Sequence, residues 1–432
     1  SLSLSLSRSL SLSLALSLAL SLSLSLSLSL SLPYPSSAAA RYLSKALARV
    51  ALVAPGSGAE PWPFASHNDE GRIYRQLDAS PVWARLATAS IARYDSLQAG
   101  SRMPFAVPGA YLCAGELGSR TVRATAEVAA QLGLTPTWLD AAALAKWAQP
   151  LLRLPATATG MLETKGAGHL SPRGCVAAQR RLAAAQGAHV LDTAAVAVRL
   201  AADGLVHVQL ANGQTLQARQ ALVAAGAFTD AALLDGFDVP LAVQGRTVLL
   251  RDVTSLLEVA PELKRLPCLI TDARAPDDGS LLEDIYMLPP VSYPDGRTYI
   301  KIGTGDFDHP LPTVEARRAW FVGPPAARDT AVLAGVLDAL LPVTQNAPER
   351  TLNCAITNTP SGYPIIDFPP VQNNSLHRRR LLLAAGGCGK AAKSADEIGR
   401  LAALQLLGRE SWPPEYPRHL FAPWTAENAA KL

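Results

Sequence analysis

Near the C-terminal end of the chain, an apolar strand pattern stops at a cluster of glycines and is followed by a helical pattern. The apolar run covers residues 381–385, the glycines lie within residues 386–390, and helical spacing covers residues 396–407. Residues 222–228 show a second apolar run that ends in a small-residue turn, and residues 36–54 read as a small-residue helix followed by a strand. Units in which buried strands alternate with helices are typical of α/β proteins. The sequence therefore predicts an α/β fold.

The helix predicted from residue 36 lacks the turn that should precede it. In a doubly wound domain, a G-x-G-x-x-G loop joins the first strand to its helix, and its backbone N–H groups bind phosphate. Residues 32–37 instead read Leu-Pro-Tyr-Pro-Ser-Ser, with no glycine and with two prolines that have no N–H to donate. The following strand, residues 50–54, ends in Ala54-Pro55, where an acidic residue that binds ribose is expected. Both departures weaken nucleotide binding at this position.

Residues 1–32 alternate serine and leucine almost without interruption. A period of two is typical of a strand with one apolar face, but ordinary strands are much shorter. A CT dinucleotide repeat encodes alternating serine and leucine, so a translated microsatellite explains the pattern, whereas a signal peptide needs a continuous apolar run and a basic start. We expect residues 1–35 to be a low-complexity segment that is disordered or artefactual, and the strand before residue 36 to be missing.

Composition excludes several classes of function. With 432 residues and 49% hydrophobic content, the chain can bury a large core, and its net charge of +4 is spread without blocks of one sign. We therefore expect a small-molecule partner rather than nucleic acid or a membrane surface. The five cysteines are odd in number and form no C-x-x-C pair, which argues against a disulfide framework and against a metal site.

Residues 66–75 concentrate hydroxyl, imidazole, carboxylate and guanidinium groups in a short stretch. This density favours a ligand-facing loop that includes Ser66, His67, Arg72 and Arg75. The alternative for such a segment taken alone is a solvated charged turn.

Four separated blocks together resemble the D-amino acid oxidase and sarcosine oxidase family of FAD-dependent amine oxidoreductases. They are residues 66–75, residues 169–190, residues 222–228, and the pair 354–367 and 384–403. The resemblance covers nearly all of residues 36–425, and within the family it is greatest to monomeric sarcosine oxidase and its pipecolate-oxidising relatives. It implies a doubly wound FAD-binding domain, incomplete at its N-terminus, with an inserted α+β substrate domain.

The resemblance also divides the chain. After the low-complexity segment 1–35, it implies three parts of the FAD-binding domain and two parts of the substrate domain. The FAD-binding parts are residues 36–115, 169–240 and 346–432, and the substrate parts are residues 116–168 and 241–345.

Two residues acquire a flavin role through the resemblance. Cys354 matches the cysteine that binds FAD covalently in the sarcosine oxidase group, whereas a lone cysteine is otherwise more often a small core residue. Lys301 interrupts an apolar run and matches a lysine that promotes the reaction of the reduced flavin with oxygen. Alternation out to solvent on an edge strand is the other interpretation of Lys301.

The substrate pair implied by the resemblance is Arg75 and Lys393, which would bind a carboxylate through a guanidinium fork and an ammonium group. The family's active-site histidine is replaced, because the sequence runs Gly303-Thr304-Gly305-Asp306, and this departure argues against sarcosine itself. The remaining matches are assigned to cofactor contacts or tight turns: Ser66, His67, Arg72, Lys390, Gly226, Gly386 and Gly389.

The activity implied is oxidation of the C–N bond of an amino acid or N-alkyl amino acid to the imine, with FAD as cofactor and oxygen as acceptor. A dehydrogenase with another acceptor and an inactive product that does not bind FAD are the alternatives. A monomer is favoured. The C-terminal Ala-Lys-Leu resembles a peroxisomal address, and the alternatives are a chance tail and a cytoplasmic protein.

Overall fold

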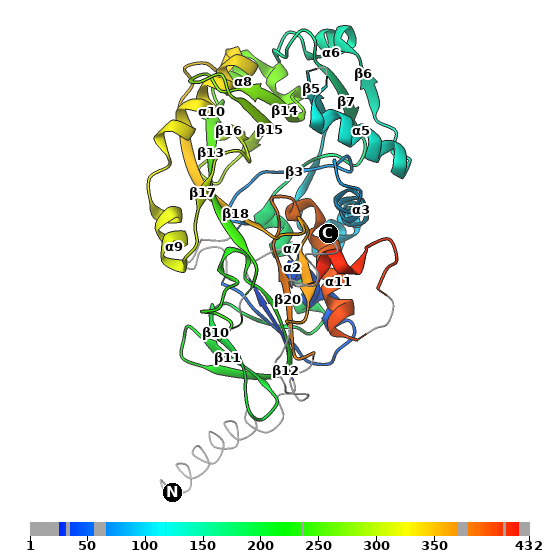
Figure 1. The fold of residues 1–432 in the computed structure, drawn as a ribbon, viewed down its shortest axis with the longest axis vertical. Helices are drawn as coiled ribbons and strands as arrows, with labels where there is room; N and C mark the ends of the chain where they lie inside the picture. The colour runs from blue at the N-terminus through cyan, green and yellow to red at the C-terminus, as the bar shows by residue number, and fades with distance from the viewer. Residues whose placement is uncertain are drawn as a thin grey trace, which may run out of the picture.

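The computed structural model describes residues 26–31, 35–55, 66–116, 118–235, 237, 239–369, 379–408 and 412–422 of the chain. These residues form two large sheets, one in the lower and one in the upper half of the view in Figure 1. Helices pack against both sheets, and no helix among the described residues is long and apolar enough to cross a membrane.

The first sheet is built around five parallel strands. In spatial order they are β9 (His189–Leu191), β2 (Val50–Val53), β1 (Leu26–Ser31), β12 (Thr215–Ala224) and β20 (Leu381–Ala385). Numbered along the chain, these strands follow the order 3-2-1-4-5 of doubly wound nucleotide-binding domains. The antiparallel strands β10 (Ala195–Leu200), β11 (Val206–Leu210) and β19 (Ile365–Asp367) extend the sheet. The predicted doubly wound fold is confirmed.

The central strand of this sheet comes from the serine–leucine repeat. Leu26–Ser31 pairs in parallel with β12 on one side and β2 on the other. The structure thus has a strand before residue 36, where the sequence predicts that it is missing; the artefactual origin of the repeat stays a prediction. The physical reason is the period of two, which suits a strand of any length, including six residues. Residues 1–25 and the expected loop at 32–34 lie outside the described residues.

Three helices cover the first sheet: α2 (Pro35–Ser44), α7 (Pro172–Ala185) and α11 (Ala391–Leu406). Helix α2 connects β1 to β2, α7 leads into β9, and α11 follows β20. A Cβ atom added to Gly399 of α11 would lie 2.5 Å from Cβ of Ala38 and 2.6 Å from the carbonyl oxygen of Pro35. The two helices therefore pack closely enough that this position requires glycine.

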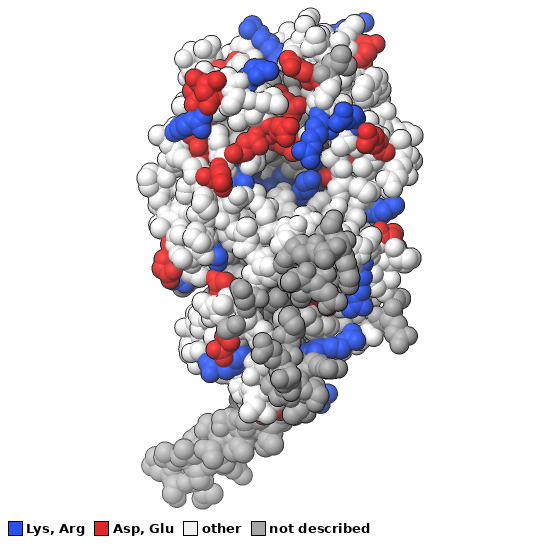
Figure 2. Space-filling model, viewed as in Figure 1, with Lys and Arg blue, Asp and Glu red and all other residues white. Residues whose placement is uncertain are grey.

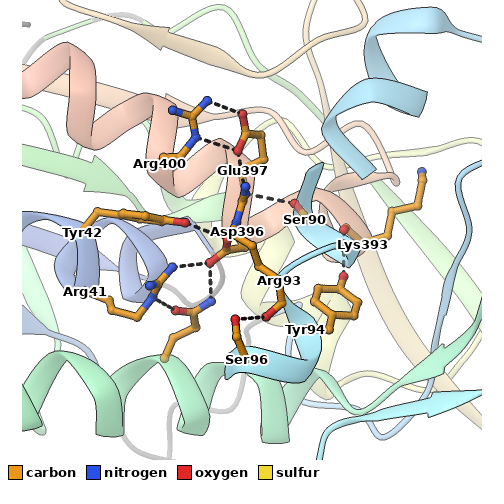
Figure 3. A network of polar contacts seen from close by, with 11 residues as sticks. Arg41, Tyr42, Ser90, Arg93, Tyr94, Ser96, Lys393, Asp396, Glu397 and Arg400 are labelled. Carbon is orange, nitrogen blue, oxygen red and sulfur yellow. Dashed lines mark hydrogen bonds and ion pairs between the residues drawn. The ribbon is translucent and has the colours of Figure 1, made fainter. Parts of the chain in front are cut away.

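A buried polar network fixes these helices to one another (Figure 3). The carboxylate of Asp396, which is 2% exposed, accepts hydrogen bonds from Arg41 of α2 at 2.7 Å and from Gln179 of α7 at 2.8 Å. Arg93 bonds both Asp396, at 2.5 Å, and Glu397, at 2.6 Å. The network holds α11 in a defined position, and the N-terminal turn of α11 carries two of the predicted site residues.

The second sheet contains nine mainly antiparallel strands. They are β17 (His309–Pro310), β13 (Ala242–Asp252), β16 (Thr298–Gly303), β15 (Leu281–Ser292), β14 (Cys268–Arg274), β5 (Tyr111–Gly115), β7 (Thr159–Glu163) and β6 (Thr137–Leu139) in order, with β18 (Glu349–Asn358) also paired to β13. One face packs with α10 (Ala327–Leu340) and α6 (Ala141–Ala148) around a core of leucine, isoleucine and valine. The other face is directed toward the active-site residues described below.

Shorter elements complete the fold. A small sheet of β3 (Arg72–Tyr74), β8 (Gly168–Leu170) and β4 (Ala106–Pro108) lies between the two halves in Figure 1. The remaining helices are α3 (Pro81–Ile91), α4 (Tyr94–Ser101), α5 (Arg120–Leu132), α8 (Leu256–Val259) and α9 (Val314–Val322), with short 3-10 helices at Gly226–Phe228, Pro261–Arg265, Pro342–Thr344 and Arg418–Phe421.

The domain boundaries stay a prediction, and two strands of the second sheet come from segments expected in the FAD-binding domain. Strand β5 belongs to the second sheet although it precedes residue 116, and β18 belongs to it although it follows residue 345. The local sequence of a strand does not indicate which of two sheets it joins.

Candidate active site

The carboxyl ends of the parallel strands mark the place where a doubly wound domain binds its ligand. Gly226 lies two residues after the end of β12 and adopts a positive φ of 56°, with no atom within 4 Å of the position that a Cβ would occupy. After the neighbouring strand β20, Gly386 and Gly389 also have positive φ values, 82° and 68°. A Cβ at Gly386 would lie 2.1 Å from Thr359. Both turns therefore require glycine, and the backbone at Gly226 is open to a ligand.

These two turns fit a dinucleotide such as FAD, because its diphosphate and flavin need close approach to backbone. The start of α2 fits less well. Helix α2 begins at Pro35, and residues 32–37 contain no glycine. FAD bound here would thus be held mainly by the turns after β12 and β20.

Asp78 gathers three of the predicted binding residues around one buried carboxylate. Its Oδ2 lies 2.8 Å from Nη1 of Arg75 and 3.1 Å from Nζ of Lys393, and its Oδ1 lies 3.3 Å from Nζ of Lys390. Asp78 is 1% exposed. Three positive groups against one negative group leave a formal positive surplus, which suits an anionic ligand.

The protonation states in this cluster follow from burial and charge. Burial would raise the pKa of Asp78, but the cations Lys393, Arg75 and Lys390 outweigh it and hold the pKa well below its usual range. Burial lowers the pKa of Lys393 to about 7, with Asp78 opposing the shift and Arg75 adding to it. Lys393 can therefore change its charge near neutral pH.

Lys301 lies on β16 inside the second sheet and is 1% exposed. Its ammonium group pairs with the carboxylate of Asp69 and donates to the carbonyl oxygen of Gly71 at 2.9 Å. Asp69 also pairs with Arg72 and accepts a hydrogen bond from the Tyr293 hydroxyl at 2.8 Å. The interpretation of Lys301 as an exposed edge-strand residue is therefore wrong.

Burial, and then the charge of Arg72, lowers the pKa of Lys301 well below its usual value. The ring of Tyr286 lies beside the ammonium group, 6.0 Å from Nζ to the ring centroid. Lys301 is thus a buried amine whose Nζ atom contacts one carboxylate, that of Asp69.

Cys354 lies on the same face of the second sheet as Lys301. In the register of β13, Arg246 pairs with Cys354 and Leu250 pairs with Lys301. Paired residues of antiparallel strands share a face, and residues 246 and 250 share a face because an even number of positions separates them. Cys354 is half-buried, and its backbone oxygen accepts a hydrogen bond from Trp320 at 2.8 Å. Its thiol is free, so it is available for bonding to a flavin.

The other predicted cofactor residues lie close together at the start of the segment that leads into β3. Ser66 is exposed, and its carbonyl oxygen accepts a hydrogen bond from Arg72 at 2.9 Å. His67 Nδ1 is buried with no hydrogen-bond partner among the described residues. Burial, then the charges of Arg173 and Arg180, lower the pKa of His67 to about 4. His67 is therefore neutral at pH 7 and can accept or donate one hydrogen bond to a ligand.

The structure thus forms two carboxylate-centred clusters, and the sequence interpretation missed both centres. Asp69 binds Arg72 and Lys301, and Asp78 binds Arg75 and Lys393. One sequence signal was present: Asp69, Arg72, Arg75 and Asp78 follow one another at intervals of three residues. The partner lysines, which lie far away in the chain, carried no such signal.

The surface agrees with an anion-binding site. Figure 2 shows a hollow in the upper half of this face, with lysine and arginine atoms at its lower edge and acidic residues above it. Among the described residues, no group of His, Cys, Asp or Glu side chains could hold a metal ion.

Comparison with protein-family models places the chain in a class defined by its cofactor. Residues 36–405 match the model of the FAD dependent oxidoreductase family. The chain therefore belongs to this family, and it is an FAD-dependent oxidoreductase. A search of curated proteins finds no match.

Several solved structures share the fold. NikD, described as an unusual amino acid oxidase essential for nikkomycin biosynthesis, has a TM-score of 0.72 at 20% identity, over 93% of this chain and 98% of that chain. Glycine oxidase from Geobacillus kaustophilus has a TM-score of 0.67 at 18% identity, over 93% and 98% of the two chains. L-proline dehydrogenase from P. horikoshii has a TM-score of 0.69 at 16% identity, over 90% and 95%. At these identities the likeness concerns the fold.

Proposed function

We propose that this enzyme oxidises the C–N bond of an amino acid or N-alkyl amino acid and uses oxygen as the electron acceptor. The observation that carries the proposal is the buried ammonium group of Lys301 on the sheet face that also holds Cys354. When bound, FAD supplies the two-electron oxidation of the amine to an imine, and oxygen that takes up these electrons with two protons becomes hydrogen peroxide.

The protein's own groups have separate roles in this proposal. Lys301 stabilises the negative charge that develops on oxygen as it accepts an electron, and burial strengthens this effect because water does not screen it. Asp69 fixes the position of the ammonium group. Arg75 and Lys393 bind the substrate carboxylate and so orient the amine.

The flavin contacts are assigned in the same way. Gly226, Gly386 and Gly389 let the backbone approach FAD, and His67, Arg72, Ser66 and Lys390 make further contacts with the cofactor. We propose that Cys354 forms a thioether with the flavin. The peroxisomal address remains a proposal from the sequence alone, because Leu432 lies outside the described residues.

The experiment is to load the full chain with FAD and to follow oxygen consumption with a series of amino acids and N-methyl amino acids. One hydrogen peroxide per oxygen consumed supports the oxidase. In Lys301→Met, we expect oxidation of the reduced flavin by oxygen to slow about 100-fold, while anaerobic reduction by the amine stays within about twofold. Lys264→Met, at an exposed lysine, is the matched control.

Two other outcomes would overturn the proposal. Turnover with an artificial dye but not with oxygen would identify a dehydrogenase, and protein that stays colourless after refolding with FAD would identify an inactive product. The covalent link has its own readout: yellow colour that survives acid precipitation should be lost in Cys354→Ser and kept in Cys388→Ser, which changes another half-buried cysteine.

A further inference from the structure

We propose that Asp78 is a positioning residue that holds Arg75, Lys390 and Lys393 together as a site for the substrate carboxylate. The inference deepens the proposed function and rests on it, because it explains how the two substrate-binding groups come to lie side by side. Asp78 itself would make no contact with the substrate.

The geometry shows a shared anchor. Arg75 follows β3 and Lys393 belongs to α11, yet both reach the same oxygen of Asp78, at 2.8 Å and 3.1 Å. Two cations this close repel each other strongly in a buried site unless a negative charge lies between them. Asp78 supplies that charge, and it is the carboxylate that both cations contact.

Asp78 is well placed to act as a fixed anchor. Its side chain is fully buried, and its Oδ1 accepts a hydrogen bond from the backbone N–H of Ser80 at 3.1 Å. Ser80 is the N-cap residue of α3, so this hydrogen bond joins the Asp78 carboxylate to the start of that helix. Movement of Asp78 would disturb this cap. The three cations therefore contact a carboxylate whose position is fixed.

One N–H group of the cluster is still able to donate a hydrogen bond to a further anion. Nε of Arg75, a residue that is 9% exposed, has no hydrogen-bond acceptor among the described residues. Aromatic rings adjoin the two cations: Tyr111 lies 5.1 Å from the Arg75 guanidinium and Trp83 lies 5.7 Å from Lys393 Nζ. These apolar walls reduce screening, so a carboxylate that replaces water here gains more than it would at the surface.

The pKa of Lys393 depends on the negative charge of Asp78. Three charged groups face Lys393: Asp78 and Arg75 from the segment after β3, and Lys390 at the N-cap of α11. Two aromatic residues are also near: the Trp83 ring of α3 lies beside the ammonium group, and the Tyr94 hydroxyl donates a hydrogen bond to the backbone oxygen of Lys393. Of the charged groups, Asp78 is the one that raises the pKa of Lys393. Without Asp78, the ammonium group should lose its proton at a lower pH.

The test measures the binding of propionate to the FAD-loaded protein by calorimetry between pH 5.5 and 8.5, with propionamide as the uncharged comparison. In the wild type, propionate affinity should fall as pH rises through about 7, by up to about tenfold for each pH unit. In Asp78→Asn, the midpoint of this fall should move to lower pH, and affinity at pH 7 should decrease about tenfold. Propionamide binding should not depend on pH in either protein.

Two variants separate positioning from a general loss of structure. Asp329→Asn changes another buried aspartate, which bonds Thr247 and His309, and should leave the propionate profile unchanged. Lys393→Gln should weaken propionate binding and remove its pH dependence between pH 6 and 8. An unfolded Asp78→Asn protein would be replaced by Asp78→Glu, for which we expect a smaller shift in the same direction.

The outcomes also separate this inference from the proposed function. Wild-type protein that binds no propionate and oxidises no amino acid would contradict the proposed function. Wild-type binding with an unshifted midpoint in Asp78→Asn would contradict the inference alone. Tighter propionate binding in Asp78→Asn would show that Asp78 competes with the ligand, and it would overturn the positioning role.

Discussion

Single residues in this site were predictable where their chemistry is unusual in its local sequence. Lys301 interrupts an apolar strand, and the structure places it as a buried amine. Its partner Asp69 lies 232 positions away, and nothing in the spacing of either residue indicates the pair. Contacts between distant segments depend on the tertiary arrangement, which local pattern does not encode.

A prediction at this scale concerns Asp69. In Asp69→Asn, Lys301 and Arg72 lose the carboxylate that they share, and we expect a loss of about 3 kcal/mol in the free energy of unfolding, measured by urea denaturation. Tyr293→Phe removes one hydrogen bond to the same carboxylate but keeps its charge, so it should cost only about 1 kcal/mol. Equal losses in the two variants would show that the charge of Asp69 is unimportant.

Helices and strands were predicted well where their periodicity is strong. The strand at residues 381–385 and the helix followed by a strand within residues 36–54 are confirmed. The helix expected over residues 396–407 is α11, which begins at Ala391 rather than at Asp396. The start of α11 was not predicted because its first turn contains polar residues, and the regular spacing of apolar residues begins only after it.

The close packing of α11 on α2 gives a prediction for an element. In Gly399→Ala, the new Cβ would meet Cβ of Ala38 at 2.5 Å and the backbone N of Ala39 at 2.8 Å, so we expect a loss of about 1–3 kcal/mol in thermal or urea unfolding. Gly100→Ala, in α4, meets only a Leu182 methyl at 3.4 Å and should be neutral or stabilising by up to about 1 kcal/mol. If both substitutions behaved alike, the contact between α2 and α11 would not limit stability.

At the scale of the whole molecule, the α/β class was predictable because strand–turn–helix units recur along the chain, whereas the doubly wound arrangement was implied by the family resemblance. The membership of each sheet was not predictable, since β5 and β18 join the second sheet across the expected boundaries. Strands that cross between halves resemble other strands in sequence, and only long-range pairing decides which sheet they enter.

Cofactor binding should be visible in the stability of the whole chain. FAD at about 1,000 times its Kd should stabilise the folded state by about 4 kcal/mol, which raises the thermal midpoint by several degrees. FMN, which lacks the adenylate half, should have a much smaller effect. A thermal midpoint unchanged by FAD would show that the turns after β12 and β20 do not hold the cofactor without a glycine loop before α2.

The central strand has a further consequence. Since β1 repeats every two residues, sliding it by two positions toward its C-terminus would replace each serine with serine and each leucine with leucine against β2 and β12. Sliding the other way would bring Pro33, which has no N–H, into the ladder. The sheet therefore accepts a series of equivalent alignments in one direction only.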